Sequence, residues 1–309
     1  MERAPDVSIC VATYRRPAGL ARLLESLSRL KLPEGMEVEV VVVDNDAAGE
    51  AQGAAVAAGD FARGVRWFVE PRQNIAHARN RAVREARAPW LAFADDDEVV
   101  EEDWIAAFWA ASERHEADGF FGPVLPRLEA VVTPWLDAER FYSMPARRSG
   151  TPLTASDVFS GNSFLRRALF ERRGFDPGWG RTGGSDTELF DHLLSAGARF
   201  RWCAEARVWE FVPPRRHRLG WLTQRAFRGG VGFTRLQCER RRPGAVSRGL
   251  PRALLAVVLL LPLVPFSLLA GRAAAARVWL RLCPQLGHLW AFSGRSYEEY
   301  ASSSPPGTA

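Results

Sequence analysis

Four short apolar segments, each followed by a polar stretch, constrain the fold of the N-terminal half more than any other feature of the chain. The segments 7–13, 38–43, 65–69 and 90–94 are rich in β-branched residues and predict buried strands. The stretches 18–30 and 75–87, and an alanine-rich stretch that ends near residue 63, predict the intervening helices. Strands that alternate with helices at this spacing predict an α/β fold with a mixed, mostly parallel sheet flanked by helices.

Polar residues follow each of the four predicted strands. In sheets of this kind, ligands bind beyond the carboxyl ends of the strands, which selects the stretches 13–17, 44–46, 72–79 and 95–98. The first strand is not followed by G-x-G-x-x-G, and the chain contains no G-K-[ST]. A dinucleotide-binding fold and a P-loop are therefore both disfavoured.

Three consecutive carboxylates, Asp95, Asp96 and Asp97, end the fourth predicted strand and precede Glu98. Carboxylates held this close repel one another, and some should have raised pKa values unless a cation compensates them. A divalent ion such as Mg²⁺ or Mn²⁺, held by one or two carboxylates and by phosphate oxygens, would explain the cluster. The alternative is a solvated acidic turn that caps a helix starting near Glu101.

Cysteine spacing and regional charge limit the compartment and the partners. The four cysteines lie far apart, without C-x-x-C, which argues against a disulfide framework or a structural zinc site and favours a reduced cytosolic setting. The charged N-terminus lacks the apolar core of a signal peptide. Residues 201–250 hold twelve arginines and three glutamates, so this segment carries +9 and the rest of the chain −4. The basic segment lacks a helix-turn-helix or RNA-binding signature, so nucleic acid is not the expected anionic partner.

The most apolar stretch, 253–270, follows the basic segment. Its eighteen residues would span about 27 Å as a helix, near the roughly 30 Å of a hydrocarbon core, and Pro262 and Pro265 should kink it. A second segment, 273–292, places Arg277 and Arg281 on one helix face. Two interpretations stay open: a buried pair of helices, or a membrane-associating hairpin beside an anionic leaflet. Arginines at the flank of an apolar stretch favour the second.

Five sequence motifs together resemble family 2 glycosyltransferases of the GT-A fold, a Rossmann-like nucleotide-sugar-binding fold. The resemblance covers roughly residues 5–235 and is closest to the bacterial group that builds exopolysaccharides of the succinoglycan type. Each motif is weak alone, but their order and spacing agree with the family. The matching stretches are VSICVATYRRPAGLARLLESL, VVVDNDA, NIAHARNRAVREARAPWLAFADDDEVVEEDW, SGNSFLRRALFERRGFDP and GGSDTELFDHLLSAG.

The resemblance implies roles for the residues at the predicted strand ends. Asp44 would hydrogen-bond the base, usually uracil, and Arg79 would help to neutralise the departing diphosphate. The alternatives are a turn residue for Asp44 and a surface helix arginine for Arg79. Asp95 and Asp97 would form the D-x-D pair that holds the metal, Mg²⁺ or Mn²⁺. The full set of residues implied to bind the nucleotide-sugar is Thr13, Tyr14, Arg15, Asp44, Asn74, Arg79, Asp95 and Asp96.

The resemblance also implies an acceptor side in the second half of the predicted domain. Asp186 matches the family's catalytic base, whereas Ser185 departs from the usual Glu, which puts the acceptor contacts in doubt. The alternative is that Ser185 or Asp186 is the N-cap of a helix, with Glu188 completing a capping box. Asn162 and Trp179 are further candidates for acceptor contacts, against a turn role and a core role respectively.

These observations predict a glycosyltransferase domain over 1–240, a basic and hydrophobic membrane-associating helical segment over 241–300, and a flexible tail over 301–309. We expect nucleotide binding in 1–125 and acceptor binding in 126–240. The predicted activity is an inverting, metal-dependent transfer from a nucleotide-sugar to a saccharide, or to a saccharide linked to polyprenyl diphosphate, at the cytoplasmic face of the inner membrane. The alternatives are a polyprenyl-phosphate hexosyltransferase and a non-catalytic binding subunit of a polysaccharide assembly.

Overall fold

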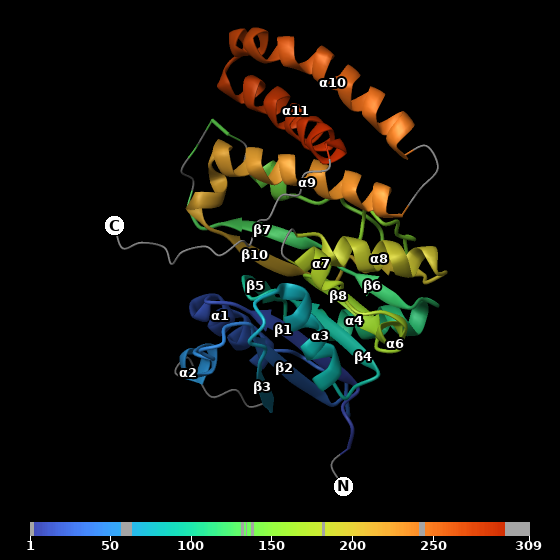
Figure 1. The fold of residues 1–309 in the computed structure, drawn as a ribbon. Coiled ribbons are helices and arrows are strands. Elements are labelled where there is room, and N and C mark those ends of the chain that lie inside the picture. The colour runs from blue at the N-terminus through green and yellow to red at the C-terminus, as the bar shows by residue number, and fades with distance from the viewer. Residues whose placement is uncertain are drawn as a thin grey trace. The chain divides into compact units, whose positions relative to one another are not determined.

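The computed structural model describes residues 3–56, 64–130, 133, 135–136, 139–180, 183–240 and 245–293. The described chain divides into two compact units. The first, here called the sheet unit, contains the described residues of 1–127, 143–180 and 184–211. The second, called the helical unit, consists chiefly of 212–240 and 245–293. Each unit is described by itself (Figure 1).

A seven-stranded sheet forms the centre of the sheet unit, with the strand order β3-β2-β1-β4-β8-β6-β9 (Figure 1). The first four strands are parallel, β6 and β9 are parallel, and β8 is antiparallel to both β4 and β6. The predicted mixed, mostly parallel sheet is therefore confirmed. The strand bounds are β1 Val7–Thr13, β2 Val38–Asp44, β3 Val65–Val69, β4 Trp90–Ala94, β6 Gly119–Phe121, β8 Asn162–Arg166 and β9 Phe200–Trp202.

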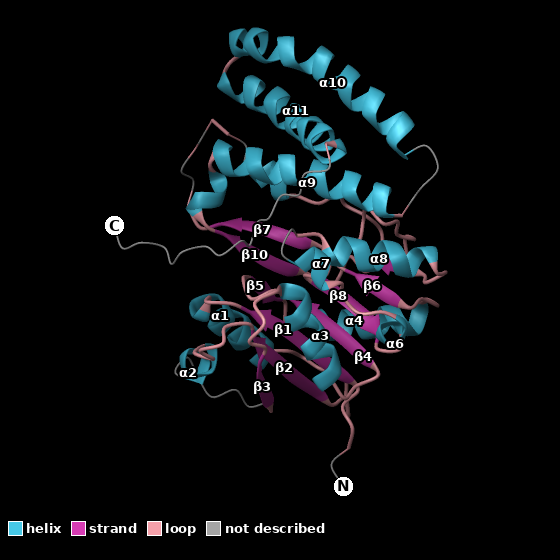
Figure 2. Ribbon diagram, in the orientation of Figure 1, coloured by secondary structure: helices cyan, strands magenta, loops and turns pink. Residues whose placement is uncertain are grey.

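Successive residues of the buried strands point to opposite faces of the sheet, so each face has its own core. Ile9 and Val11 pack in one cluster, which α1 and α4 cover, while Cys10 packs in the other, with α3 and α8. Helices and strands of the sheet unit are distinguished by colour in Figure 2. The helix bounds are α1 Pro17–Ser28, α2 Ala51–Val56, α3 Ile75–Glu85, α4 Trp104–Arg114, α6 Leu169–Arg172, α7 Pro177–Gly180 and α8 Ser185–Ser195.

A buried carboxylate ties the middle of the sheet to the segment before β4. Glu39 on β2 accepts hydrogen bonds from the Ser8 hydroxyl at 2.6 Å, from the Arg87 backbone amide at 2.7 Å, from Arg87 Nε at 2.9 Å and from Arg66 at 3.1 Å. Burial alone would raise the pKa of Glu39, but these hydrogen bonds outweigh burial and hold the pKa below its usual value. Glu39 therefore stabilises the fold as an anion.

A smaller sheet has the strand order β5-β10-β7, with β5 Glu98–Val100 antiparallel to β10 Val208–Val212. The strand β7 covers Val124–Leu128. Because β5 begins at Glu98, it starts immediately after the acidic run. The Phe211 amide donates a hydrogen bond to the Asp97 carbonyl at 3.0 Å, which fixes the backbone of that run.

Long helices dominate the helical unit: α9 Leu219–Glu239, α10 Ala245–Ser267 and α11 Arg272–Phe292. Within this unit, α11 packs against both α9 and α10 (Figure 1). The sequence assigned α9 to the transferase domain, whereas in the structure α9 groups with the C-terminal helices. Pro262 and Pro265 lie inside α10, and the helix continues through both. Shorter elements of this unit are α5 Glu139–Tyr142, η1 Pro214–His217 and η2 Leu268–Ala270.

One C-terminal helix is long and apolar enough to cross a membrane. The segment 248–270 has 23 residues and a mean hydropathy of 2.6, and 6% of its apolar window is buried inside the structure. The interpretation of this stretch as a buried helix is therefore wrong for the chain as described. Arg277 and Arg281 are both exposed on α11, as their spacing predicted.

Candidate active site

Three of the predicted nucleotide contacts, Thr13, Tyr14 and Arg15, lie at the end of β1 and in the turn that follows it. Arg15 adopts a left-handed backbone conformation with φ 52°, which is uncommon for a residue with a side chain. Its Nε donates to Asp46 Oδ2 at 2.6 Å, and its guanidinium lies 5.0 Å from the centre of the Tyr14 ring. The ion pair joins the ends of β1 and β2, and it lowers the pKa of Asp46 through the Arg15 hydrogen bond.

Asn45, which the sequence analysis did not select, holds three strand ends together. Its side-chain amide donates to the carbonyls of Glu70 and Arg72 at 2.8 and 2.9 Å, and its oxygen accepts from the Asn74 amide at 2.7 Å. Its own amide donates to the Thr13 carbonyl at 2.8 Å. The three turns that follow β1, β2 and β3 are thus joined at one edge of the sheet.

Asp44 and Asn74 are engaged by neighbouring backbone. The Asp44 carboxylate accepts from the amides of Asp46 and Ala51, both at 3.0 Å, which orders the turn after β2 and the start of α2. Asn74 is the N-cap of α3, since its side chain accepts from the Ala76 amide at 2.9 Å. The turn role considered for Asp44 is observed; a carboxylate keeps further lone pairs with which to accept a hydrogen bond.

Each aspartate of the acidic run has an arginine partner. Arg16 Nη1 lies 2.9 Å from both Asp96 Oδ1 and Asp97 Oδ2, and Arg79 Nη2 donates to Asp95 at 3.0 Å. The Thr13 hydroxyl donates to Asp96 at 2.8 Å. The Arg79 side chain is only 11% exposed. The alternative of a surface helix arginine is therefore wrong, because Arg79 points at the acidic run.

Burial raises the pKa of Asp96, in the acidic run, and of Glu98, which follows it. The pKa of Asp96 is raised to about 6, first by burial and then by the charges of Asp97 and Asp95, against the opposing effects of Arg16 and Thr13. Burial and the neighbouring carboxylates also raise the pKa of Glu98 well above its usual value. The predicted pKa perturbation is confirmed, and a solvated acidic turn is not what the structure shows.

Gly161 leaves room for two of these carboxylates. A Cβ at this position would lie 2.8 Å from Glu98 Oε1 and 3.0 Å from Asp95 Oδ2, so a side chain would crowd both. Glu98 itself accepts from the Asp95 amide at 2.8 Å. A glycine at this place therefore allows the backbone of the turn before β8 to approach the acidic run closely.

The donor set fits a hard divalent cation. In the ranges that the structure describes, no three carboxylate, imidazole or thiol groups converge as a preformed metal site. Mg²⁺ needs only one or two carboxylates when phosphate oxygens complete its shell. The side chains of Asp95 and Asp97 are 43% and 19% exposed. The neighbouring carboxylates of Asp96 and Glu98 are buried. The chemistry of these residues is therefore compatible with such an ion.

Asp186 lies at the start of α8 and is connected to the acidic run through one short turn. Its Oδ2 accepts from the amide and the hydroxyl of Ser160, both at 3.3 Å, and Ser160 directly precedes Gly161. The two bonds are long, and the side chain is half-buried rather than enclosed. The predicted base and Asp95, the first residue of the predicted D-x-D pair, therefore lie beside consecutive residues, Ser160 and Gly161.

Three predicted acceptor contacts are instead buried. The Asn162 side chain accepts from Trp104 Nε1 at 2.8 Å and donates to the carbonyls of Pro123 and Ala206 at 3.0 and 2.7 Å, and it has no exposed surface. Trp179 is 3% exposed, and Ser185 is 1% exposed. Their burial favours the structural alternatives, and acceptor contacts by these side chains stay a prediction.

The capping-box interpretation of α8 is also wrong. The N-cap is Gly184 in a left-handed conformation with φ 92°, and no side chain caps the helix. Ser185 and Asp186 are already inside its first turn, and Glu188 pairs with Arg173 at 2.8 Å. Asp186 is therefore not the N-cap, although its Oδ1 accepts from the Thr187 amide at 2.8 Å within the first turn.

The sequence predicts no individual role for Arg16, Asn45 or Glu98, although each lies in one of the stretches that follow the predicted strands. A signal for Arg16 was present, because a run of three carboxylates needs more cationic partners than Arg79 alone.

Comparisons with known proteins agree with this geometry. Residues 8–174 match the model of the family described as "Glycosyl transferase family 2". The chain is 34% identical to the succinoglycan biosynthesis protein ExoM of Rhizobium meliloti (strain 1021) over 242 residues, which is 76% of this chain and 75% of ExoM.

Two solved structures share the fold. The structure of S. aureus TarS in complex with UDP-GlcNAc has a TM-score of 0.54 at 14% identity and covers 95% of this chain and 93% of that one. The mannosyltransferase PcManGT from Pyrobaculum calidifontis, in complex with GDP-Man and Mn²⁺, has a TM-score of 0.55 at 19% identity and covers 98% and 77%. These similarities show a common fold, the one that the sequence motifs implied.

Proposed function

Because the chain belongs to glycosyl transferase family 2 and is a glycosyltransferase, we propose that it moves a sugar from a nucleotide-sugar, with uridine as the expected base, to a saccharide of a bacterial polysaccharide. The name of ExoM, a succinoglycan biosynthesis protein, supports a polysaccharide product. The UDP-GlcNAc and GDP-Man in the two solved relatives support a nucleotide-sugar donor.

The observation that carries the proposal is the meeting of basic and acidic side chains at the carboxyl ends of β1, β2 and β4. Arg15 and Arg16, from the turn between β1 and α1, and Arg79, from α3, reach this edge, and each pairs there with a carboxylate. A nucleoside diphosphate needs cations for its phosphates and hydrogen-bond acceptors for its base and ribose. Both kinds of group lie together at this edge.

Arg79 is suited to stabilise the departing diphosphate. Its guanidinium is held against the Phe175 ring at 5.6 Å and hydrogen-bonded to Asp95, so its orientation is set before the donor binds. A cation fixed in advance stabilises charge that develops during the reaction better than one that must reorganise. Asp95 and Asp97 would hold a divalent ion, which when bound would supply further positive charge for the same oxygens.

Asp186 is proposed as the general base. It would accept the proton of the acceptor hydroxyl while that oxygen attacks the anomeric carbon, in a single displacement that inverts the anomeric centre. The Ser160 hydrogen bonds would orient the carboxylate without fully occupying it. A free carboxylate is too weak a base to ionise a sugar hydroxyl beforehand, so proton transfer would accompany bond formation.

Membrane association is proposed from the helical unit. A helix of 23 residues spans about 35 Å, enough for a hydrocarbon core of about 30 Å. Exposed Arg248 and Arg252 flank its apolar part, as expected beside an anionic cytoplasmic leaflet. The acceptor would then be a saccharide on a polyprenyl-diphosphate carrier, or alternatively polyprenyl phosphate itself.

The experiment is a comparison of Asp186→Asn with Asp103→Asn. Asp103 is exposed and makes no side-chain cap bond at α4, so it serves as a matched control. We expect both variants to be stabilised by the same UDP-sugar and metal in a thermal-shift assay, since ligand binding raises stability by mass action. Only Asp186→Asn should lose turnover, by about 10² or more. Near wild-type turnover of Asp186→Asn with intact donor binding would disprove the base assignment.

A further inference from the structure

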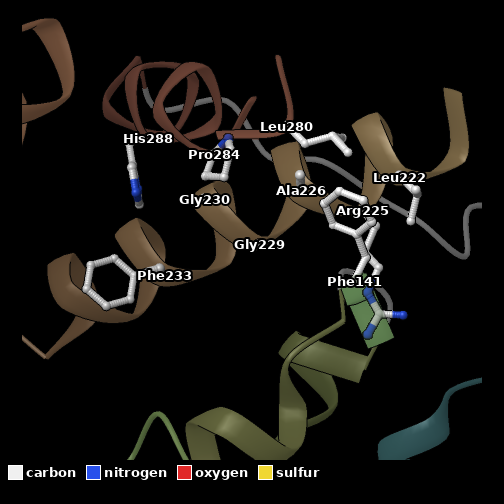
Figure 3. Close-up of a pocket in the computed structure, with 10 residues that line it drawn as sticks. All are labelled: Phe141, Leu222, Arg225, Ala226, Gly229, Gly230, Phe233, Leu280, Pro284 and His288. Carbon is white, nitrogen blue, oxygen red and sulfur yellow. The ribbon is translucent and has the colours of Figure 1, made fainter. Parts of the chain in front are cut away.

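A cavity of about 480 Å³ opens between α9 and α11 in the helical unit, and no step of the proposed transfer uses it. Figure 3 shows Arg225 and Phe141 at one end and Phe233 and His288 at the other. Phe233 is 58% exposed, which is unusual for a large aromatic side chain without a partner surface. The lining residues are Phe141, Leu222, Arg225, Ala226, Gly229, Gly230, Phe233, Leu280, Pro284 and His288.

Glycines in α9 and α11 set the spacing of the two helices beside this cavity. A Cβ at Gly230 would overlap the Pro284 carbonyl, and a Cβ at Gly287 would overlap the Phe227 carbonyl, so the two helices touch backbone to backbone at these points. At Gly229, in contrast, a Cβ would meet nothing within 4 Å. Close contact at Gly230 next to open space at Gly229 leaves a hollow beside the helix contact.

The cavity is apolar apart from one cation. Burial lowers the pKa of His288, so its ring is neutral near pH 7, and its Nδ1 lies 2.8 Å from the Thr234 hydroxyl. Arg225 lies over the rings of Tyr142 and Trp221 at 4.9 and 5.5 Å and forms no ion pair with any described residue. The ligand that complements this cavity is a hydrocarbon chain with an anion at one end.

The C-terminal part of the helical unit is strongly basic. Residues 212–293 contain fourteen arginines and a single acidic residue, Glu239, which pairs with Arg235 at 2.7 Å. Two further described carboxylates, Glu129 and Glu139, belong to the segment 128–142 of the same unit. A second copy of 212–293 would therefore bring mainly positive charge to Arg225. The bare apolar helix α10 is packed on α11 in the same unit, which favours an occupant that comes from a membrane.

We propose that this groove binds the chain of a polyprenyl phosphate or diphosphate, with its phosphate at Arg225 and its first isoprene units running toward Phe233. The assignment rests on the proposed function, because it places the lipid of a lipid-linked acceptor. We expect a lipid with one hydrocarbon chain rather than a phospholipid with two. The groove is a single cavity, so the second acyl chain of a phospholipid would lie outside it. The stacked guanidinium of Arg225 keeps its donors available to phosphate.

Glycine substitutions in the full-length protein test the groove. Gly229→Leu would fill it, and Gly232→Leu is the matched control, because a Cβ at Gly232 also meets nothing within 4 Å and Gly232 does not line the cavity. Leucine has a higher helix propensity than glycine, so both variants should fold. The probe is farnesyl phosphate, titrated by calorimetry, with farnesol and phosphatidylglycerol vesicles as the comparison ligands.

We expect wild type and Gly232→Leu to bind farnesyl phosphate alike and Gly229→Leu to bind it about tenfold or more weakly. Arg225→Gln should weaken farnesyl phosphate but not farnesol. Unchanged affinity in Gly229→Leu would overturn the proposal, as would equal competition by phosphatidylglycerol. Donor hydrolysis measured on the same variants separates the two proposals: a wild-type protein that binds farnesyl phosphate but never cleaves a nucleotide-sugar refutes the transferase proposal and leaves the groove assignment standing.

Discussion

Replacing Asn45 by aspartate tests whether one amide holds the ligand-binding edge together. The substitution keeps the shape and the acceptor for the Asn74 amide, but it removes both donors to the carbonyls of Glu70 and Arg72. Two net hydrogen bonds are worth about 1 kcal/mol each, and a buried carboxylate facing two carbonyls adds a comparable penalty. We therefore expect Asn45→Asp to lower the free energy of unfolding by about 2–4 kcal/mol.

The assay is urea denaturation at pH 7, with donor binding measured in parallel. The midpoint should fall at an unchanged slope, because the surface exposed on unfolding is the same. The control is Gln52→Glu, the same chemical change at an exposed position of α2, which should stay within about 0.5 kcal/mol of wild type. Donor affinity should also fall in Asn45→Asp, since the turn after β3, which carries Glu70 and Arg72, loses the two hydrogen bonds from position 45. A variant as stable as Gln52→Glu would refute the reasoning.

Three further substitutions probe other parts of the chain. Glu39→Gln should cost about 2 kcal/mol in urea denaturation at pH 7, and because the folded-state pKa of Glu39 is lowered, this difference should shrink as the pH falls below about 4.3. Gly180→Ala would drive a Cβ into the Asn74 side chain and should cost about 2 kcal/mol, whereas Gly53→Ala, which meets nothing within 4 Å, should be nearly neutral. Leu259→Asp on α10 should reduce co-sedimentation with anionic vesicles, since a charge at mid-membrane costs about 2.5–3.5 kcal/mol; Gln237→Asp on α9 should not.

The helices and strands, and the edge of the sheet at which a ligand is expected to bind, could be predicted from the sequence. The strand at 7–13 was predicted with its observed bounds, because a run of valine and isoleucine ended by polar residues suits a strand buried on both faces. The acidic run stands out because three adjacent carboxylates repel one another unless a cation compensates their charge. Both features depend on neighbours in sequence, and local composition therefore reveals them.

Side-chain partners across the sheet were not accessible in the same way. Arg16 reads as one more arginine in an arginine-rich chain, and only the closeness of α1 to the acidic run, where a Cβ at Gly19 would overlap the Asp96 carbonyl, brings it to Asp96 and Asp97. The burial of Trp179 and Ser185 likewise follows from how α7 and α8 pack, which periodicity does not encode.

The asparagines show why polar residues near a site divide into structural and functional ones only after folding. All four asparagines of the chain, Asn45, Asn74, Asn80 and Asn162, bond to backbone groups at least 25 positions away. An amide offers a donor and an acceptor together, so it can satisfy backbone groups that the ladder of a sheet leaves unpaired at the strand ends. A ligand also binds at these strand ends. An asparagine at this edge can therefore either pair with backbone groups or contact a ligand. What separates the uses is whether backbone carbonyls that can accept a further hydrogen bond lie within reach. At Asn162 they do, on both Pro123 and Ala206, and so the amide that resembles an acceptor contact belongs to the scaffold.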